Sequence, residues 1–500
     1  MLTITKDKLL KLKSGTDIRG VATETENEKV ELTDEVVFAV ASAFVQWYKK
    51  KFDKDCIKIA VGHDSRISAD RIKNAAINAF VAEGVTVYDC GLSSTPAMFM
   101  SIVLDIKADA ALEITASHHP YQRNGLKFFT ENGGLEGAEV SEILNLAYDA
   151  VSSNLRGSVI KYDFMSVYCE HLRSIIINGV NAGDKPLSDL KISVDAGNGA
   201  GGFFADKVLA PLGADVSGSM YLEPNGMFPN HIPNPENQQA IKSACNMVTS
   251  SSSDFGFIFD TDVDRMGCVS SNGEEINRNR LVALASVIAL DGKEGSCIVT
   301  DSLTSDGLRD FIEKDLGGKQ LRFKRGYKNV IDKAIELNAK GIESPLAIET
   351  SGHAALKENY FLDDGAYLAV KIVILLAKLS AQRKSIDALI RTLREPAESV
   401  EIRIPILLDD FKNYGENVIS SLRSCFSDKE GFSVEKENYE GVRINFNGGW
   451  FLLRLSVHDP ILPLNIESDK EGACIAIARD IKAFLSAFDK LDLSDFEKVL

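Results

Sequence analysis

Cysteine is scarce in this chain, and long apolar runs are missing. The eight cysteines among 500 residues are scattered, with no CxxC pair, so the sequence indicates neither a disulfide scaffold nor a zinc site and favours a reducing compartment. The most apolar stretches, 281–290 and 368–379, are too short to span a bilayer, and two lysines interrupt the second. We therefore expect both stretches to be core helices.

Basic residues are too few to balance the acidic ones. Lysine and arginine number 56 against 72 aspartates and glutamates, which leaves a formal charge of -16. Such a surface repels nucleic acid and anionic lipid, so we expect no nucleic-acid and no membrane partner. The first twenty residues also lack the apolar core and cleavage site of a secretory signal. The sequence favours the cytoplasm, although a protein trimmed of an organellar transit peptide would look the same.

The remaining composition is that of a globular protein with several domains. Hydrophobic residues make up 45% and charged residues 26%, with 37 glycines and 13 prolines, which excludes disordered and collagen-like chains. A strand, helix, strand pattern recurs in the first, second and third quarters of the chain, whereas the last hundred residues read as several strands and a closing amphipathic helix. This predicts three consecutive α/β domains with mixed sheets and a C-terminal α+β domain. The expected domains are 1–158, 159–273, 274–392 and 393–500.

The first motif with chemical content lies in 113–129, EITASHHPYQRNGLKFF. An apolar strand runs into Ser117 and two histidines, and Pro120 ends the regular structure, so Ser117 is expected on an exposed turn where a hydroxyl can act as a nucleophile. Lys127 follows past an Asn-Gly turn and can reach the same substrate. Taken alone, the motif favours the alternative of a polar loop whose serine bonds to its own backbone.

The second motif is FGFIFDTDVDRMG, residues 255–267. An apolar strand delivers Asp260, Asp262 and Asp264 at alternating positions, and three carboxylates this close repel one another unless a hard cation neutralises them. Mg²⁺ with oxygen ligands is the physical expectation. An EF-hand fits badly, because Arg265 stands where that loop requires glycine and Ser271 where it requires glutamate. The alternative is an acidic, solvated loop.

Two further motifs follow apolar strands. In AIETSGHAA (347–355), Glu349 and Ser351 offer acceptors for vicinal sugar hydroxyls, and His353 can transfer protons or bind phosphate. In WFLLRLSVHDPILPLNIE (450–467), an arginine, a serine and a histidine share one loop and are able to surround a phosphate. These three residues are Arg454, Ser456 and His458. A structural strand end and a simple β-turn are the respective alternatives.

Taken in order, GTDIRG, TASHHP with its lysine, DTDVDR, ETSGH and RLSVHDP resemble the signatures of the α-D-phosphohexomutase superfamily, which includes phosphoglucomutases and phosphomannomutases. The segments VGHDSR, VDAGNGAGG, FPNHIPNPE and LDDGAY are similar to family signatures as well. The resemblance spans nearly the whole chain. It implies three α/β domains and a C-terminal domain of the TATA-binding-protein-like kind around a central cleft.

The resemblance also implies an activity. Ser117 would be carried as phosphoserine and would interconvert hexose 1-phosphate and hexose 6-phosphate, of glucose and/or mannose, through a hexose 1,6-bisphosphate that also serves as activator. One Mg²⁺ per chain would be held by the three aspartates and an oxygen of phospho-Ser117. The implied catalytic residues are Ser117, Lys127, Arg19 and His118, and the implied substrate-binding residues are Arg265, Glu349, Ser351, His353, Lys328, Arg454, Ser456 and His458. Hexose phosphates are the expected partners, with the chain a monomer or a homodimer.

The sequence departs from the family pattern at three places. His458 stands where threonine is common, Tyr327 where some bacterial members carry histidine, and Ile348 where a glycine usually precedes the glutamate. Substrate preference is therefore left open. Two other interpretations also stay open: an aspartyl phosphatase with Asp260 as nucleophile and Asp262 as general acid, and a sugar-phosphate-binding relative that has lost turnover.

Overall fold

The computed structural model describes residues 4–149, 153, 155–456 and 459–500. These residues form two compact units. The first comprises the chain up to Asn277 together with Ser351–Ala354 and Leu362–Ile386, and the second holds the remaining described residues from Arg278 onward. The predicted fold class is confirmed in its domain content, since three α/β regions are followed by a fourth region with a sheet of its own. The domain boundaries at 158, 273 and 392 stay predictions.

The first sheet is mixed and has the strand order β1-β2-β6-β5-β3-β4-β8, with β7 pairing β6. Its strands are β1 (Lys13–Ser14), β2 (Asp17–Val21), β3 (Lys58–His63), β4 (Thr86–Leu92), β5 (Ala110–Ile114), β6 (Arg123–Thr130), β7 (Gly133–Gly134) and β8 (Ser158–Lys161). Its helices are α1 (Lys6–Leu10), α2 (Asp34–Phe52), α3 (Ala69–Ala82), α4 (Thr95–Val103) and α5 (Gly137–Asp149), and α6 (Phe164–Val180) follows β8 along the chain. Because β3 and β5 run parallel while β5 and β6 run antiparallel, the β5–β6 loop lies at the end of β5 that also receives the β3 loop.

Helix α2 shows how the sequence sets these elements. Thr33 caps its first turn by accepting a hydrogen bond from the amide of Val36, and the helix ends where Asp53 adopts a left-handed conformation. Its buried face joins α3, α5 and the sheet in one apolar core, in which the rings of Phe44 and Phe128 stack at 4.2 Å. This core fixes β5 and β6, the two strands that carry the serine loop.

The second sheet also belongs to the first unit and has the order β12-β11-β10-β9. Its elements are β9 (Ile192–Asp195), β10 (Phe255–Phe259), β11 (Met266–Ser270), β12 (Glu275–Ile276) and α7 (Gln238–Ser251). All five residues of β10 are buried, as its unbroken apolar sequence predicts. Helix α11 (Gly365–Ala381) packs against α6 in this unit, so the expected core helix over 368–379 is confirmed.

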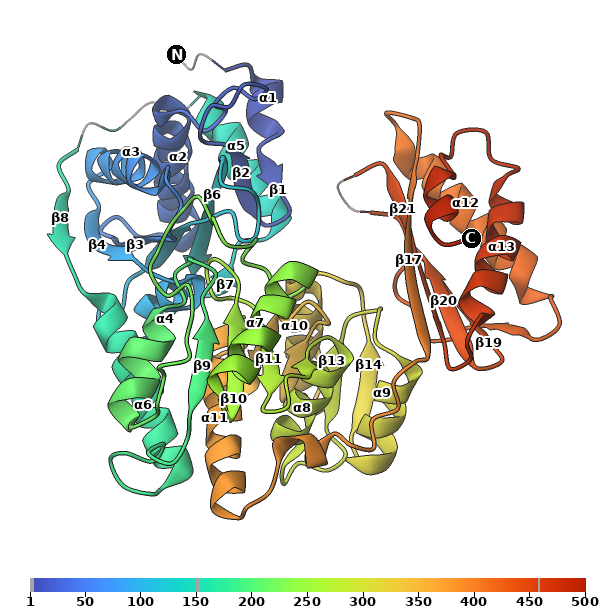
Figure 1. Ribbon diagram of the computed structural model, residues 1–500. Helices are drawn as coiled ribbons and strands as arrows, with labels where there is room; N and C mark the ends of the chain where they lie inside the picture. Colours follow the sequence, from blue (N-terminus) through green and yellow to red (C-terminus); the bar gives the residue numbers. More distant parts are fainter. Residues whose placement is uncertain (1–3, 150–152, 154, 457–458) are drawn as a thin grey trace. The chain divides into compact units, whose positions relative to one another are not determined.

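The second unit contains two sheets. The third sheet has the order β14-β13-β15-β16, and the fourth, antiparallel sheet has the order β17-β21-β20-β19-β18. Helices α12 and α13 pack on one face of the fourth sheet and share its apolar core (Figure 1). The elements are α8 (Asn279–Leu290), β13 (Cys297–Thr300), α9 (Asp306–Asp310), β14 (Lys319–Arg322), α10 (Tyr327–Ala339), β15 (Leu346–Ile348), β16 (Ala354–Leu356), β17 (Glu398–Pro405), α12 (Phe411–Ser427), β18 (Phe432–Val434), β19 (Val442–Phe446), β20 (Gly449–Leu453), β21 (Ile461–Ser468) and α13 (Ala473–Leu485). Helix α8 confirms the core helix expected over 281–290.

No helix in the part of the chain that the structure describes is both long enough and apolar enough to cross a bilayer.

Candidate active site

Ser117 lies in the loop between β5 and β6 and is almost entirely buried. Its backbone is left-handed, with φ 52°, a conformation that a serine adopts only when its surroundings impose it. Its hydroxyl accepts a hydrogen bond from Arg265 Nη2 at 3.0 Å and lies 3.3 Å from Asp260 Oδ2. The prediction of an exposed turn is therefore wrong in its solvent exposure, because residues of the second sheet pack over the serine.

Arg66 binds the backbone of this loop through hydrogen bonds to its carbonyl oxygens. Its guanidinium donates to the carbonyl oxygens of residues 117, 119, 120 and 123 and forms an ion pair with Asp64 at 3.1 Å. Asp64 in turn accepts a hydrogen bond from the hydroxyl of Thr115, which also accepts from the amide of Ser117. Arg66 was not among the residues predicted from the sequence, although it lies in the segment VGHDSR. The only signal was a charged pair directly after an apolar strand.

The three aspartates occupy the hairpin between β10 and β11. One oxygen of each of Asp260, Asp262 and Asp264 lies within 4.8 Å of the others, and all three side chains are buried. Lys127 Nζ contacts Asp264 Oδ2 at 2.8 Å, and the hydroxyl of Thr95 donates to Asp262 at 2.5 Å. The hairpin and the serine loop are thus brought together within the first unit, as the strand-end motifs predict.

The carboxylate cluster is electrostatically frustrated. Burial and the neighbouring aspartates raise the pKa of Asp260 and of Asp262. Burial opposes the ionisation of Asp264 too, but Lys127 and the other nearby cations outweigh it and lower its pKa. Oδ1 of Asp262 and Oδ1 of Asp264 are buried and accept no hydrogen bond from any described residue. Orphaned oxygens among crowded carboxylates fit the coordination of a hard divalent cation.

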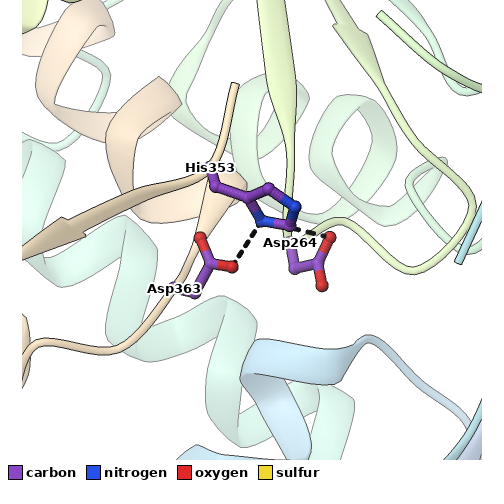
Figure 2. A group of neighbouring side chains, drawn as sticks. All are labelled: Asp264, His353 and Asp363. Carbon is purple, nitrogen blue, oxygen red and sulfur yellow. Dashed lines mark hydrogen bonds and ion pairs between the residues drawn. The ribbon is translucent and has the colours of Figure 1, made fainter. Parts of the chain in front are cut away.

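His353 joins the same cluster from the ETSGH loop. Figure 2 shows its imidazole between two carboxylates, with Nδ1 at 2.5 Å from Asp363 and 3.9 Å from Asp264. Burial alone would lower its pKa, but Asp363 and Asp264 raise it to about 9. The imidazole is therefore charged at neutral pH. Gly352 precedes it at φ +95°, and a Cβ there would lie 2.5 Å from the carbonyl oxygen of Met266.

Two further predicted residues lie in or near the serine loop. Burial and Arg265 lower the pKa of His118 to about 2, so its ring is neutral and Nδ1 faces Arg265 Nη2 at 2.5 Å. Arg19 lies on β2 opposite Gly125 of β6 and donates to Asp17 at 2.7 Å. A side chain at position 125 would collide with Arg19, since its Cβ would lie 2.9 Å from the Arg19 Cγ.

Of the remaining predicted residues, Ser351 belongs to the first unit, and the others that the structure describes lie in the second. Glu349 accepts a hydrogen bond from the amide of Gly326 at 2.6 Å, and Lys328 forms an ion pair with Asp332 one turn further along α10. Arg454 Nη1 lies 3.7 Å from a carboxylate oxygen of Glu440.

Ser456 closes the end of the RLSVHDP loop. Its amide donates a hydrogen bond to the carbonyl oxygen of Ile461, and its hydroxyl accepts one from the amide of Asp459. His458 lies outside the described residues.

Comparison with known proteins identifies the chain. Models of the phosphoglucomutase/phosphomannomutase α/β/α domains I, II and III match residues 11–153, 166–273 and 277–396. The chain belongs to the phosphoglucomutase/phosphomannomutase family. It is 28% identical to a phosphoglucomutase from Neisseria gonorrhoeae over 97% of this chain and 98% of that protein. It is also 28% identical to a phosphomannomutase/phosphoglucomutase from Pseudomonas aeruginosa over 95% of each chain.

Solved structures agree with this membership. A phosphoglucomutase/phosphomannomutase family protein from Burkholderia thailandensis superposes with a TM-score of 0.79 at 26% identity, covering 97% of this chain and 98% of that one. An N-acetylphosphoglucosamine mutase from Aspergillus fumigatus, solved with GlcNAc-6P and magnesium, has a TM-score of 0.55 at 12% identity and shows the shared fold alone. The predicted resemblance is confirmed, and the protein is an enzyme of the phosphoglucomutase/phosphomannomutase family.

Proposed function

We propose that this family member interconverts hexose 1-phosphate and hexose 6-phosphate, of glucose and/or mannose, through phospho-Ser117 and a hexose 1,6-bisphosphate. One observation carries the proposal: the hydroxyl of Ser117 is held by Arg265 and Asp260 at the edge of the three-carboxylate hairpin. A nucleophilic oxygen beside a cation and a cluster of hard ligands is the arrangement that phosphoryl transfer requires.

The transfer step can be written with this chain's own groups. A sugar hydroxyl attacks the phosphorus of phospho-Ser117, the bond between phosphorus and Oγ breaks, and the phosphorus–sugar oxygen bond forms. Arg265 Nη2, 3.0 Å from Oγ, stabilises the charge that develops on the departing serine oxygen. Lys127, held by Asp264 at 2.8 Å, is our candidate for handling the hydroxyl proton. The bisphosphate then reorients, and the reverse step returns its other phosphate to Ser117.

Asp260, Asp262 and Asp264, with an oxygen of phospho-Ser117, would hold the Mg²⁺ ion. When bound, Mg²⁺ neutralises charge on the phosphoryl oxygens. The two carboxylate oxygens without hydrogen bonds support this ligand set.

The sugar and the idle phosphate need separate contacts. We assign the sugar hydroxyls to Glu349 and to Ser351, whose buried Oγ has no hydrogen-bond partner among the described residues. The idle phosphate is assigned to Arg454 and Ser456, and His458 stays a prediction. Lys328 is kept as a substrate-binding candidate, and the charged His353 is suited to donate to a phosphate oxygen.

The test combines activity with chemistry at Ser117. Glucose 1-phosphate or mannose 1-phosphate is incubated with Mg²⁺ and a trace of glucose 1,6-bisphosphate, and 6-phosphate formation is measured. Ser117→Ala should lose activity at least about 10³-fold and lack an acid-stable phosphate. Ser101→Ala, which removes a buried hydroxyl of α4 that donates to the Met98 carbonyl, is the matched control. Absence of 6-phosphate with glucose, mannose and N-acetylglucosamine substrates would refute the proposal.

The same samples decide between the mutase and the aspartyl phosphatase interpretation. A phosphate on Asp260 is an acyl phosphate and is cleaved by hydroxylamine, whereas a phosphoserine is not. Both oxygens of Asp260 already accept hydrogen bonds from Arg265, and Oδ2 also contacts Ser117. We therefore favour serine as the phosphorylated residue, and we retain the cytoplasm and a monomer or homodimer as proposals.

A further inference from the structure

Glu440 lies two residues before β19, beside Arg454 of the proposed phosphate clamp. Its Oε2 accepts a hydrogen bond from the hydroxyl of Ser302 at 2.6 Å and from the amide of Arg325 at 3.1 Å. Its Oε1 faces Arg454, with 3.7 Å to Nη1. Both side chains are 13% exposed, so this contact is largely shielded from solvent. One carboxylate thus joins the ends of β13, β14 and β20 within the second unit.

The contacts on the two oxygens differ in strength. Those on Oε2 are well-formed hydrogen bonds, whereas 3.7 Å to Arg454 is an ion pair without one. Burial lowers the pKa of Arg454, and Glu440 is the largest of the carboxylate influences that oppose this effect, ahead of Glu401 and Asp301. Nε of Arg454 is buried and has no hydrogen-bond partner among the described residues. The guanidinium is therefore neutralised by Glu440 but is not saturated by it.

The neighbouring groups keep Glu440 in place when Arg454 is withdrawn. The amide of Arg325 donates to Glu440, and the next amide, that of Gly326, donates to Glu349. Two carboxylates thus hold the chain at these two residues. The ring of Tyr439 also packs on Phe323 at 5.0 Å. Exchange of partners at Arg454 requires only the loose ion pair to break, and the firm hydrogen bonds on Oε2 can persist.

We propose that Glu440 is an internal anion that competes with the substrate's idle phosphate for Arg454. This inference rests on the proposed function, because it takes Arg454 as the phosphate clamp. A phosphate offers Arg454 the bidentate contact that Glu440 does not make, but the carboxylate remains nearby and repels it. Glu440 thereby limits phosphate affinity. A bisphosphate that must leave the clamp to reorient would gain from such a limit, because a very tight clamp would slow its release.

The test uses Glu440→Gln in the full chain. Glutamine keeps an oxygen that can accept from Ser302 and Arg325 and removes only the charge, so we expect E440Q to bind inorganic phosphate about tenfold more tightly by calorimetry, a loss of repulsion of about 1.4 kcal/mol. With glucose 1-phosphate, KM and kcat should both fall. Glu435→Gln is the matched control, because that carboxylate faces Arg309 at 3.6 Å and is hydrogen-bonded by Asn445. E435Q should bind phosphate like the parent protein.

The outcomes separate this inference from the proposed function. Unchanged or weaker phosphate binding by E440Q overturns the competition, since Glu440 would then serve only to hold the loops. If Arg454→Gln also abolishes binding in that case, the clamp survives without the competitor. If Arg454→Gln binds phosphate normally, the clamp and the competition both fail. Should E440Q not fold, E440A replaces it with the same expectation, and if neither folds the proposal is abandoned.

Discussion

Replacing Arg66 by alanine should weaken the first unit and do so more at high pH than at low pH. The guanidinium is the shared donor for four carbonyl oxygens of the serine loop and the partner of buried Asp64. Removing one partner of a buried ion pair typically costs about 3–5 kcal/mol, because the other charge stays buried without compensation. We expect a loss in that range near pH 8.

The pH dependence follows from Asp64. Burial raises the pKa of this carboxyl to about 6, and Arg66 is the strongest influence that lowers it. Without Arg66 the folded-state pKa of Asp64 rises further above its unfolded value of about 3.9. The loss of folding stability that the substitution adds through Asp64 is therefore absent below about pH 3.9 and grows as the pH rises through the folded-state pKa. Each unit of additional shift costs about 1.4 kcal/mol at high pH. At pH 5 the variant should therefore lie closer to the parent protein.

The two tryptophans make the measurement specific to one unit. Trp47 lies in the first unit and Trp450 in the second, and both are buried. In a Trp450→Phe background, fluorescence of Trp47 during urea unfolding reports on the unit that contains Arg66. The control is Arg71→Ala, which removes an arginine from the neighbouring helix α3. A stability loss below about 1 kcal/mol at pH 8, or one that does not change between pH 5 and pH 8, would refute the reasoning.

Two more predictions follow from buried carboxyl groups. Asp262→Asn should weaken Mg²⁺ activation at least about tenfold, because it removes the charge of a proposed ligand whose Oδ1 has no hydrogen-bond partner among the described residues; titration of activity with Mg²⁺ checks this, and an unchanged half-saturating concentration would contradict it. Burial raises the pKa of Glu467 to about 7 although Trp450 donates to it. Because the folded pKa exceeds the unfolded one, the wild type should lose about 3 kcal/mol relative to Glu467→Gln between pH 4 and pH 8, as measured by Trp450 fluorescence in a Trp47→Phe background. Parallel pH profiles for the two proteins would exclude this effect.

The candidate residues that could be predicted from the sequence are those that lie just after a strand. Ser117 comes three residues after β5, and the aspartates begin one residue after β10, so periodicity and the turn residues were enough to place both motifs at strand ends. The role of Ser117 as nucleophile came from the family resemblance, because its motif alone favoured a polar loop. The metal hypothesis needed only the repulsion among three neighbouring carboxylates. Such features are local, and local features are what a single sequence encodes most plainly.

The residues that sequence reasoning missed act across the fold. Arg66 reaches a loop more than fifty residues away, and Glu440 reaches Ser302 across 138 positions. His353 was selected, but its pairing with Asp363 was not, although LDDGAY was noted as a family segment. No period or spacing encodes these pairs, because each depends on how separate strands are ordered in a sheet. The left-handed backbone of Ser117 was missed for the same reason.

The charges around Ser117 bear on the proposed pairing of a phosphorylated serine with a divalent cation. The described cluster contains the carboxylates of Asp260, Asp262, Asp264 and Asp363 and the cations Arg265, Lys127 and His353. With every group charged, four negative charges face three positive ones. A phosphate on Ser117 would add about -2 at a buried position, an excess that the local cations cannot offset. An ion of charge +2 bound at the orphaned oxygens would cancel the added charge, so we expect phosphorylation and metal binding to be coupled by the same carboxylates.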